Sequence, residues 1–174
     1  MNEALVENWN KVVKSNDDVY HLGDIALSDT TAAILYIQRL NGKIHWLRGN
    51  HDSDNRQLEI VWHCPNIVEF GKWANILKDG KRRIYMSHYP TLTSNYDEKH
   101  FSQHVLSLHG HTHQRTNWLD PKNPFLYHVG LDSHNNTPVH IDEVITDIRQ
   151  RWEEIGRLPV PVQPQDTYPY TSII

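Results

Sequence analysis

Four short apolar segments of this chain each end in a polar motif, and this arrangement restricts the possible folds more than any other feature. The motifs are Gly23-Asp24, Gly49-Asn50-His51-Asp52, Ser87-His88 and Gly110-His111-Thr112-His113. Apolar segments of this length, bounded by glycine and polar residues, are typical of buried strands. In α/β proteins, binding and catalytic groups gather where strands end and helices begin. The pattern therefore predicts a sheet whose strand ends bring the four motifs together.

Two helices are predicted before and between the first strands. Residues 2–14 carry apolar side chains at helical spacing with polar residues opposite, which indicates an amphipathic helix. Residues 28–30, Ser-Asp-Thr, provide an N-cap for a second helix that runs to about Leu40. The predicted strands lie at 19–22 and 43–48. This alternation indicates a parallel sheet, which places Asp24 and Asn50 at the same edge.

The chain between the second and third motifs has a different pattern. Apolar segments at 67–73 and 76–78 precede Asp79-Gly80, a strong hairpin signal, and residues 83–86 return from the turn. We therefore expect antiparallel strands in a second sheet that packs on the first. The returning strand would deliver His88 at its end.

The rest of the chain predicts one further connection, the last regular elements and a tail. Residues 89–104 indicate a surface connection with a short helix, and its position between two of the motifs suggests a wall of a substrate pocket. The other predicted elements are a helix at 57–62, strands at 105–108 and 125–129, and a helix at 142–154. We expect one domain over residues 1–155 and an extended tail over 156–174, which contains Pro159, Pro161, Pro164 and Pro169.

Charge and cysteine content narrow the class of protein. The net charge of −4 and pI near 6.3 give no basic surface, so no stable nucleic-acid partner is expected and a histidine-rich nucleic-acid binder is disfavoured. The one cysteine, Cys64, cannot form an internal disulfide, and no signal-peptide pattern opens the chain. No apolar segment approaches the roughly 20 residues that span a bilayer. We therefore expect a cytoplasmic protein without a membrane role.

The chain has 13 histidines, and their positions separate candidate ligands from core residues. His88, His111 and His113 follow predicted strands, where a metal site would form. His21, His45, His109 and His128 lie within apolar segments and are expected to be packed and hydrogen-bonded. Aspartate, asparagine and histidine side chains together are donors of a divalent transition-metal site.

In their order and spacing, the four motifs resemble those of the calcineurin-like metallophosphoesterases, especially the small single-domain bacterial and phage members. The resemblance extends from about residue 1 to about residue 150. It implies an α/β fold in which two packed mixed β-sheets are flanked by helices, an α/β/β/α sandwich. Members of the family open with a strand that ends in Asp-x-His. The 22 residues before Gly23 hold no such motif, so we expect an N-terminally truncated form.

The resemblance also implies a chemistry and a set of roles. The expected activity is metal-dependent hydrolysis of a phosphomonoester or phosphodiester by a metal-activated hydroxide at a dinuclear site. Asp24 would bridge the two ions. Asn50, His88 and His111 would complete the shell of one ion, and His113 would bind the other. His51 would face the leaving group, and Asp52 would orient it. We expect Mn²⁺ first, with iron, Zn²⁺, Ni²⁺ and Co²⁺ as alternatives.

The missing first motif leaves alternatives open. Without its two ligands, we expect one tightly held ion, weak hydrolysis and a homo-oligomer that forms through the vacant sheet position. The alternative is a catalytically inactive metal-binding or interaction fragment of the same fold. Asp132-Ser133-His134 has the form of the absent motif, but we expect it to be the ordinary turn after a late strand.

Overall fold

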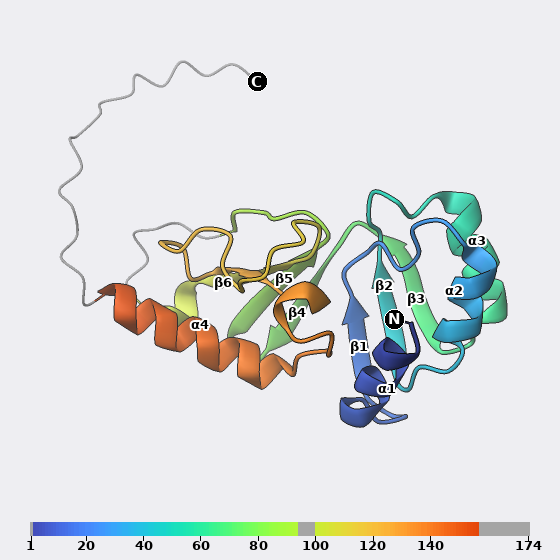
Figure 1. Ribbon diagram of the computed structural model, residues 1–174. Coiled ribbons are helices and arrows are strands. Elements are labelled where there is room, and N and C mark those ends of the chain that lie inside the picture. The colour runs from blue at the N-terminus through green and yellow to red at the C-terminus, as the bar shows by residue number, and fades with distance from the viewer. Residues whose placement is uncertain (1, 94–99, 157–174) are drawn as a thin grey trace, which may run out of the picture.

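The computed structural model of this chain describes residues 2–93 and 100–156, and these residues form two β-sheets flanked by helices (Figure 1). The first sheet has the order β1 (Asp18–His21), β2 (Lys43–Leu47), β3 (Ile67–Lys72) and is parallel. The second has the order β4 (Ala74–Asp79), β5 (Arg82–Ser87), β6 (Val105–His109), β7 (Leu126–His128). The predicted α/β architecture with two sheets is therefore confirmed.

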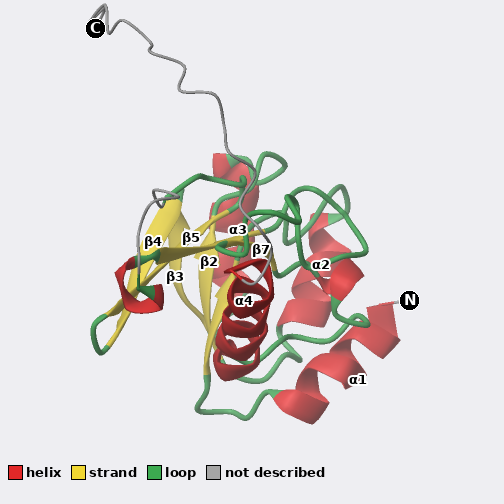
Figure 2. Cartoon of the chain, turned by 90° about the vertical axis from the view of Figure 1, so that its left-hand side faces the viewer, coloured by secondary structure: helices red, strands yellow, loops and turns green. Residues whose placement is uncertain are grey.

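Helices cover the outer faces of both sheets. Near the first sheet lie α1 (Asn2–Val12), α2 (Thr30–Ile37) and α3 (Asp54–His63), and against the second lies α4 (Ile141–Gly156) (Figures 1 and 2). Two short 3-10 helices, η1 (Phe101–Gln103) and η2 (Leu131–Ser133), lie in connections. The Asp29 carboxylate accepts a hydrogen bond of 2.9 Å from the N–H of Ala32, so the predicted N-cap of α2 is confirmed.

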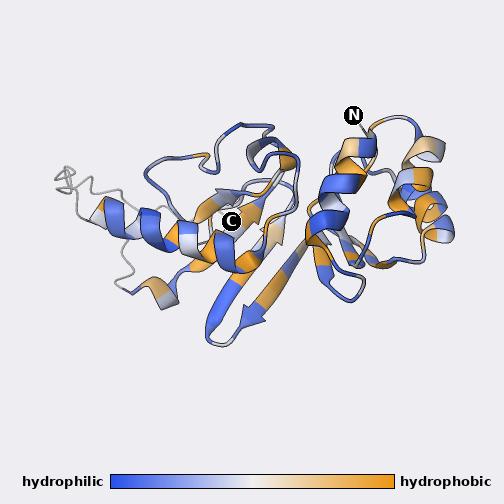
Figure 3. Ribbon diagram, turned by 60° about the horizontal axis from the view of Figure 1, so that its bottom comes forward, coloured by the Kyte–Doolittle hydropathy of each residue, from blue (hydrophilic) through white to orange (hydrophobic). Residues whose placement is uncertain are grey.

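Two apolar clusters hold the layers together. One joins α1, α2 and α3 to the first sheet through Trp9, Val13, Ile37, Ile44, Trp46, Ile60, Cys64 and Ile67. The other joins the second sheet and α4 to Leu47 of β2 and to Leu22, which directly follows β1, and so connects the two sheets. In Figure 3 the apolar residues of α4 recur along the helix between polar ones, as the helical period requires. Each fully buried large side chain contributes about 1.5–3 kcal/mol.

The segment 67–86 differs in part from the prediction. The hairpin is confirmed, because β4 and β5 are antiparallel and Gly80 at the turn has a φ of +59°. The assignment of 67–73 to the same antiparallel sheet is wrong, since β3 pairs with β2 in parallel and only Trp73 separates it from β4. Ile67 packs in the helix-facing cluster beside Ile44. The packing of Ile67 against Ile44 therefore places β3 in the first sheet, although the local sequence pattern suggested a hairpin with the strands that follow.

The sheet topology brings the predicted motifs to common edges. In the first sheet His21 pairs with Trp46, so the loops after β1 and β2 leave side by side. In the second sheet Ser87 pairs with His109, which does the same for the loops after β5 and β6. Since parallel strands end at the same edge, residues far apart in sequence meet there.

Some predictions fall at the limits of the described chain. The short helix expected between 89 and 104 is present as η1, while residues 94–99 of that connection lie outside the described residues. Residues 157–174 also lie outside them, so the tail over 156–174 and the domain boundary stay predictions. β1 is at one edge of its sheet, and association through that edge stays a prediction. No helix in the described part is long and apolar enough to cross a membrane.

Candidate metal centre

Two glycines allow the loops after β1 and β2 to touch. A Cβ atom on Gly23, which has a φ of +97°, would lie 2.6 Å from the backbone nitrogen of Gly49. A Cβ atom on Gly49 would lie 2.1 Å from Oδ1 of Asp24. Both distances are far below van der Waals contact, so neither position has room for a side chain. Asp24 itself has a φ of +56°, a left-handed conformation that the contacts around it must maintain.

Four of the predicted metal ligands converge at these strand ends. Donor atoms of Asp24, His88 and His111 all lie within 4.8 Å of one another. Oδ1 of Asn50 lies 2.8 Å from Nε2 of His88 and 3.0 Å from Nδ1 of His111. His88 is buried while Asn50 and His111 are exposed, so the group opens to solvent on one side. The four residues lie on four separate loops, so their distances from one another could not be read from the sequence.

The hydrogen bonds of His88 show that the group suits a cation. Nδ1 of His88 lies 2.7 Å from the carbonyl oxygen of Leu22, which can only accept, so Nδ1 carries the proton. In the neutral ring, Nε2 then presents a lone pair to the Asn50 oxygen and, at 3.3 Å, to the Asp24 carboxylate. Acceptors that face one another repel unless a proton or a metal ion lies between them. A carbonyl that fixes the tautomer of a ligating histidine is common around protein metal ions.

Asp52 fixes the two loops rather than the side chain of His51. Its Oδ2 accepts hydrogen bonds from the backbone N–H of Asp24 at 2.7 Å, the backbone N–H of Gly49 at 2.8 Å and the indole N–H of Trp46 at 3.1 Å. The side chain is only 1% exposed. The expectation that Asp52 orients the His51 ring is therefore wrong, because the carboxylate points into the protein and joins the loop backbones.

His51 lies at the exposed rim of the group. Its backbone N–H donates to Oδ1 of Asp24 at 2.9 Å, and its carbonyl accepts from Nη1 of Arg56. The same guanidinium nitrogen reaches the carbonyl of Ala26 at 3.0 Å, so Arg56 ties the two loops together from α3. The His51 imidazole forms no hydrogen bond within residues 2–93 and 100–156. It is therefore free to meet a ligand.

His113 lies apart from the converging group. Its Nδ1 is 2.9 Å from a carboxylate oxygen of Asp132, and both side chains are exposed. His134 turns instead toward the carbonyl of His128 at 3.1 Å. Asp132 and His134 therefore point to different partners, as expected for an ordinary turn. The role of His113 as a ligand of a second ion stays a prediction.

Two residues near the group, Tyr89 and Arg56, were not identified as functional from sequence. Tyr89 directly follows His88 and places its ring at 5.2 Å from the ring of His88 and 4.6 Å from that of His111, edge to face. Arg56 holds the loops after β1 and β2 through the carbonyls of Ala26 and His51. The only sequence signal for Tyr89 is its position directly after a candidate ligand.

Buried histidines lie behind the exposed group. Burial lowers the pKa of His21 even though the carboxylates of Asp52 and Asp24 act in the opposite direction. Burial also lowers the pKa of His109, and burial, followed by the nearby His109, lowers the pKa of His128 to about 4. His45, His109 and His128 are hydrogen-bonded as predicted, to Asp18 and Glu69, to Gly110 and to Ser133 respectively. Because their pKa values are lowered, the rings of His21, His109 and His128 are neutral at pH 7.

Comparisons with known proteins agree with this geometry. The family described as the calcineurin-like phosphoesterase superfamily domain matches residues 1–127. Gene 66 protein of Mycobacterium phage D29 is 29% identical over 166 residues, which cover 84% of this chain and 83% of that protein. Uncharacterized protein MJ1445 of Methanocaldococcus jannaschii is 31% identical over 155 residues, which cover 83% of this chain and 73% of that protein.

One solved structure shares the fold. The crystal structure of AQ665 from Aquifex aeolicus, described as a protein of unknown function, matches with a TM-score of 0.60 and 22% identity, and the match covers 83% of each chain. At that identity the likeness concerns the fold alone.

Proposed function

We propose that this chain, which belongs to the calcineurin-like phosphoesterase superfamily, is a metal-dependent phosphoesterase. The observation that carries the proposal is the convergence of Asp24, Asn50, His88 and His111 at the ends of strands, with the Nε2 lone pair of His88 directed at two oxygen atoms. A site of two imidazoles, one amide oxygen and one carboxylate fits a divalent transition ion.

The candidate ligands would bind two ions of different affinity. Asp24, Asn50, His88 and His111 hold one ion, for which Mn²⁺ is our first candidate, with iron, Zn²⁺, Ni²⁺ and Co²⁺ as alternatives. When bound, such an ion polarises a phosphoryl oxygen and lowers the pKa of a bound water. We assign His113 to a second, more weakly held ion, because its ring nitrogen lies outside the converging group.

His51 is our candidate for the proton donor to the leaving group. Its loop is held on both sides, by the Asp24 carboxylate at its N–H and by Arg56 at its carbonyl, while its imidazole is exposed and free of hydrogen bonds to the described chain. An imidazole in that situation can protonate a departing alkoxide or phenoxide near neutral pH. The substrate class is a phosphomonoester or phosphodiester.

Hydrolysis of aryl phosphate esters tests the proposal. The rate with an aryl phosphodiester and an aryl phosphomonoester is measured with added Mn²⁺ and with a chelator. We expect hydrolysis with Mn²⁺ and none with the chelator, and His51→Ala should lower the rate by about 10²-fold or more while metal content is kept. His63→Ala is the matched control, because His63 is also exposed and lies at the end of α3.

Three results would contradict the proposed phosphoesterase or one of its assigned roles. Hydrolysis that persists with the chelator would contradict a metal-dependent mechanism. Loss of metal from His51→Ala would contradict the separation of ligands from the proton donor. Metal binding without any hydrolysis would favour the alternative, an inactive metal-binding member of the fold.

A further inference from the structure

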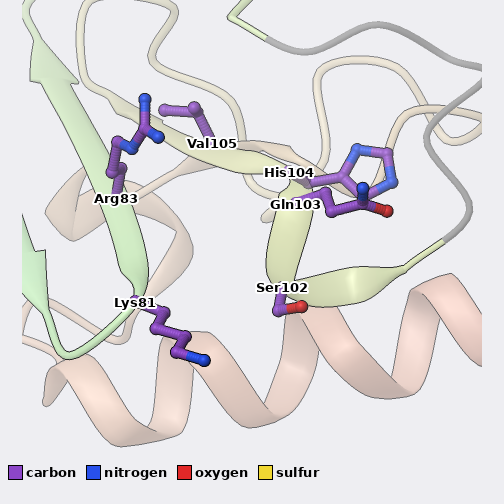
Figure 4. Close-up of a pocket in the computed structure, with 6 residues that line it drawn as sticks. All are labelled: Lys81, Arg83, Ser102, Gln103, His104 and Val105. Carbon is purple, nitrogen blue, oxygen red and sulfur yellow. The ribbon is translucent and has the colours of Figure 1, made fainter.

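A polar pocket of about 280 Å³ lies beside the β4–β5 hairpin (Figure 4). It is lined by Lys81, Arg83, Ser102, Gln103, His104 and Val105. Lys81 is in the turn before β5 and Arg83 is near its start, whereas the metal ligand His88 follows the other end of that strand. His88 is five positions beyond Arg83, which corresponds to roughly 16 Å of extended chain at the usual rise per residue. The pocket is therefore separate from the metal centre.

The pocket carries positive charge that the described chain does not neutralise. Lys81 and Arg83 form no ion pair with residues 2–93 or 100–156, and none of the six lining residues is acidic. The adjacent Arg82 differs from them, because its guanidinium lies 3.1 Å from the Asp79 carboxylate. Two cations thus border one hollow whose lining holds no carboxylate. They favour an anion.

Neutral donors complete the lining. The exposed hydroxyl of Ser102 takes part in no hydrogen bond within the described residues. The side-chain oxygen of Gln103 accepts from the N–H of His100 at 3.0 Å, so its NH₂ group remains as a donor. Figure 4 shows Lys81 and Arg83 on the hairpin side and Ser102 and Gln103 on the facing segment. Donors on both sides can surround a small oxyanion.

The wall that carries these donors is held in place. The ring of His104 stacks on that of Phe125 at 3.7 Å with an angle of 10° between the planes, and His104 is 3% exposed. Phe101, the first residue of η1, lies under the guanidinium groups of Arg82 and Arg149 at 5.8 and 5.0 Å from its centre. The segment opposite the hairpin is thus anchored by buried aromatic contacts.

We propose that this pocket binds the phosphate group of a small ligand, independently of the metal centre. An arginine offers a planar pair of donors and a lysine a point charge, and both are suited to phosphate oxygens. The volume is at the lower limit for small-molecule sites, which fits inorganic phosphate or a small phosphomonoester rather than an extended polymer. The proposal requires no hydrolytic activity.

Titration of the ¹⁵N-labelled protein, observed by NMR in 150 mM salt, tests this site. The two probes are inorganic phosphate and glycerol 3-phosphate, each added without metal. We expect saturable shifts of the amide signals of Lys81, Arg83, Ser102 and Gln103 with at least one probe. The probe with the lower Kd identifies whether free phosphate or an organic ester is the preferred source of the group.

Two double variants of equal charge separate specific binding from general attraction. K81A/R83A should raise the Kd at least tenfold, whereas K11A/K14A, which removes two exposed lysines elsewhere, should leave it within twofold. The single variant Lys81→Ala serves if the double variant does not fold, and it should raise the Kd at least threefold.

Three results would overturn the proposed pocket. They are an absence of saturable shifts at the four amides with both probes, an unchanged Kd in the lysine–arginine variants, and an equal rise in Kd in K11A/K14A. Because the titration contains no metal and measures no turnover, failure of the phosphoesterase proposal would leave its outcome unaffected.

Discussion

Replacing Asp52 with alanine should destabilise both the fold and the metal centre, although Asp52 is not among the proposed ligands. The substitution leaves three donors without their common acceptor: the N–H groups of Asp24 and Gly49 and the indole N–H of Trp46. A buried unsatisfied donor costs about 1–3 kcal/mol, and relaxation recovers part of this. We therefore expect the free energy of unfolding to fall by about 3–5 kcal/mol.

The conservative substitution Asp52→Asn should destabilise the fold less than Asp52→Ala. An amide oxygen can accept the same three hydrogen bonds, but these lose the charge that makes hydrogen bonds to a carboxylate roughly twice as strong. We expect a smaller loss of about 1–2 kcal/mol. The matched control is Asp54→Ala, because Asp54 is exposed and pairs only with Arg48 at the surface. That change should cost less than about 1 kcal/mol.

Urea unfolding and calorimetric titration with Mn²⁺ measure the two effects. Asp52→Ala should weaken Mn²⁺ binding at least tenfold, because the loops that carry Asp24 and Asn50 lose their shared anchor. Asp52→Asn should lie between the wild type and Asp52→Ala in both assays. Equal unfolding free energies and equal Mn²⁺ affinities in Asp52→Ala and Asp54→Ala would refute the role of Asp52 as the shared anchor.

Three further predictions concern acid stability and the ligand loops. The folded-state pKa of His128, about 4, lies below its unfolded value of 6.5, so the stability that the neutral ring contributes is complete above pH 6.5 and is lost as pH falls toward 4. Urea unfolding should show that the free energy of unfolding falls by about 3 kcal/mol between these pH values, and that His128→Asn reduces this fall. An unchanged dependence of the unfolding free energy on pH in that variant would contradict the prediction. Gly49→Ala should abolish Mn²⁺ binding in calorimetry, because its Cβ would meet Asp24, and retained affinity would show that the loops can separate without cost. Asn50→Ala and His111→Ala should each lower metal content in elemental analysis, and full occupancy in either variant would remove that residue from the ligand set.

Much of the candidate site could be predicted because its signals are local. A strand that ends in Gly-Asp or Gly-Asn-His-Asp identifies both the end of an element and the donor types that follow it. The parallel pairing of β1 with β2 and of β5 with β6 then brings those ends together. The capping aspartate of α2 and the hairpin at Asp79-Gly80 were predictable for the same reason, since each depends on residues within one turn.

The features that sequence could not give depend on long-range contacts. β3 joins the first sheet because Ile67 packs beside Ile44. The sequence of residues 67–73 does not indicate that their pairing partner is β2. Because Asp52 directly follows His51 in the sequence, its side chain was expected to contact the His51 ring. The turn instead directs the carboxylate inward, where it accepts hydrogen bonds from Asp24, Trp46 and Gly49. The pairing of His113 with Asp132 likewise depends on how the loop after β6 meets η2.

The most direct test of the account is elemental analysis of the purified chain after incubation with Mn²⁺, made alongside its rate of aryl phosphodiester hydrolysis. The described residues bring one group of ligands together, at Asp24, Asn50, His88 and His111. We therefore predict about one tightly held ion per chain, and hydrolysis that is weak and lost with a chelator. No bound ion would contradict the metal centre itself, and two stoichiometric ions with rapid turnover would contradict the assignment of a single strong site.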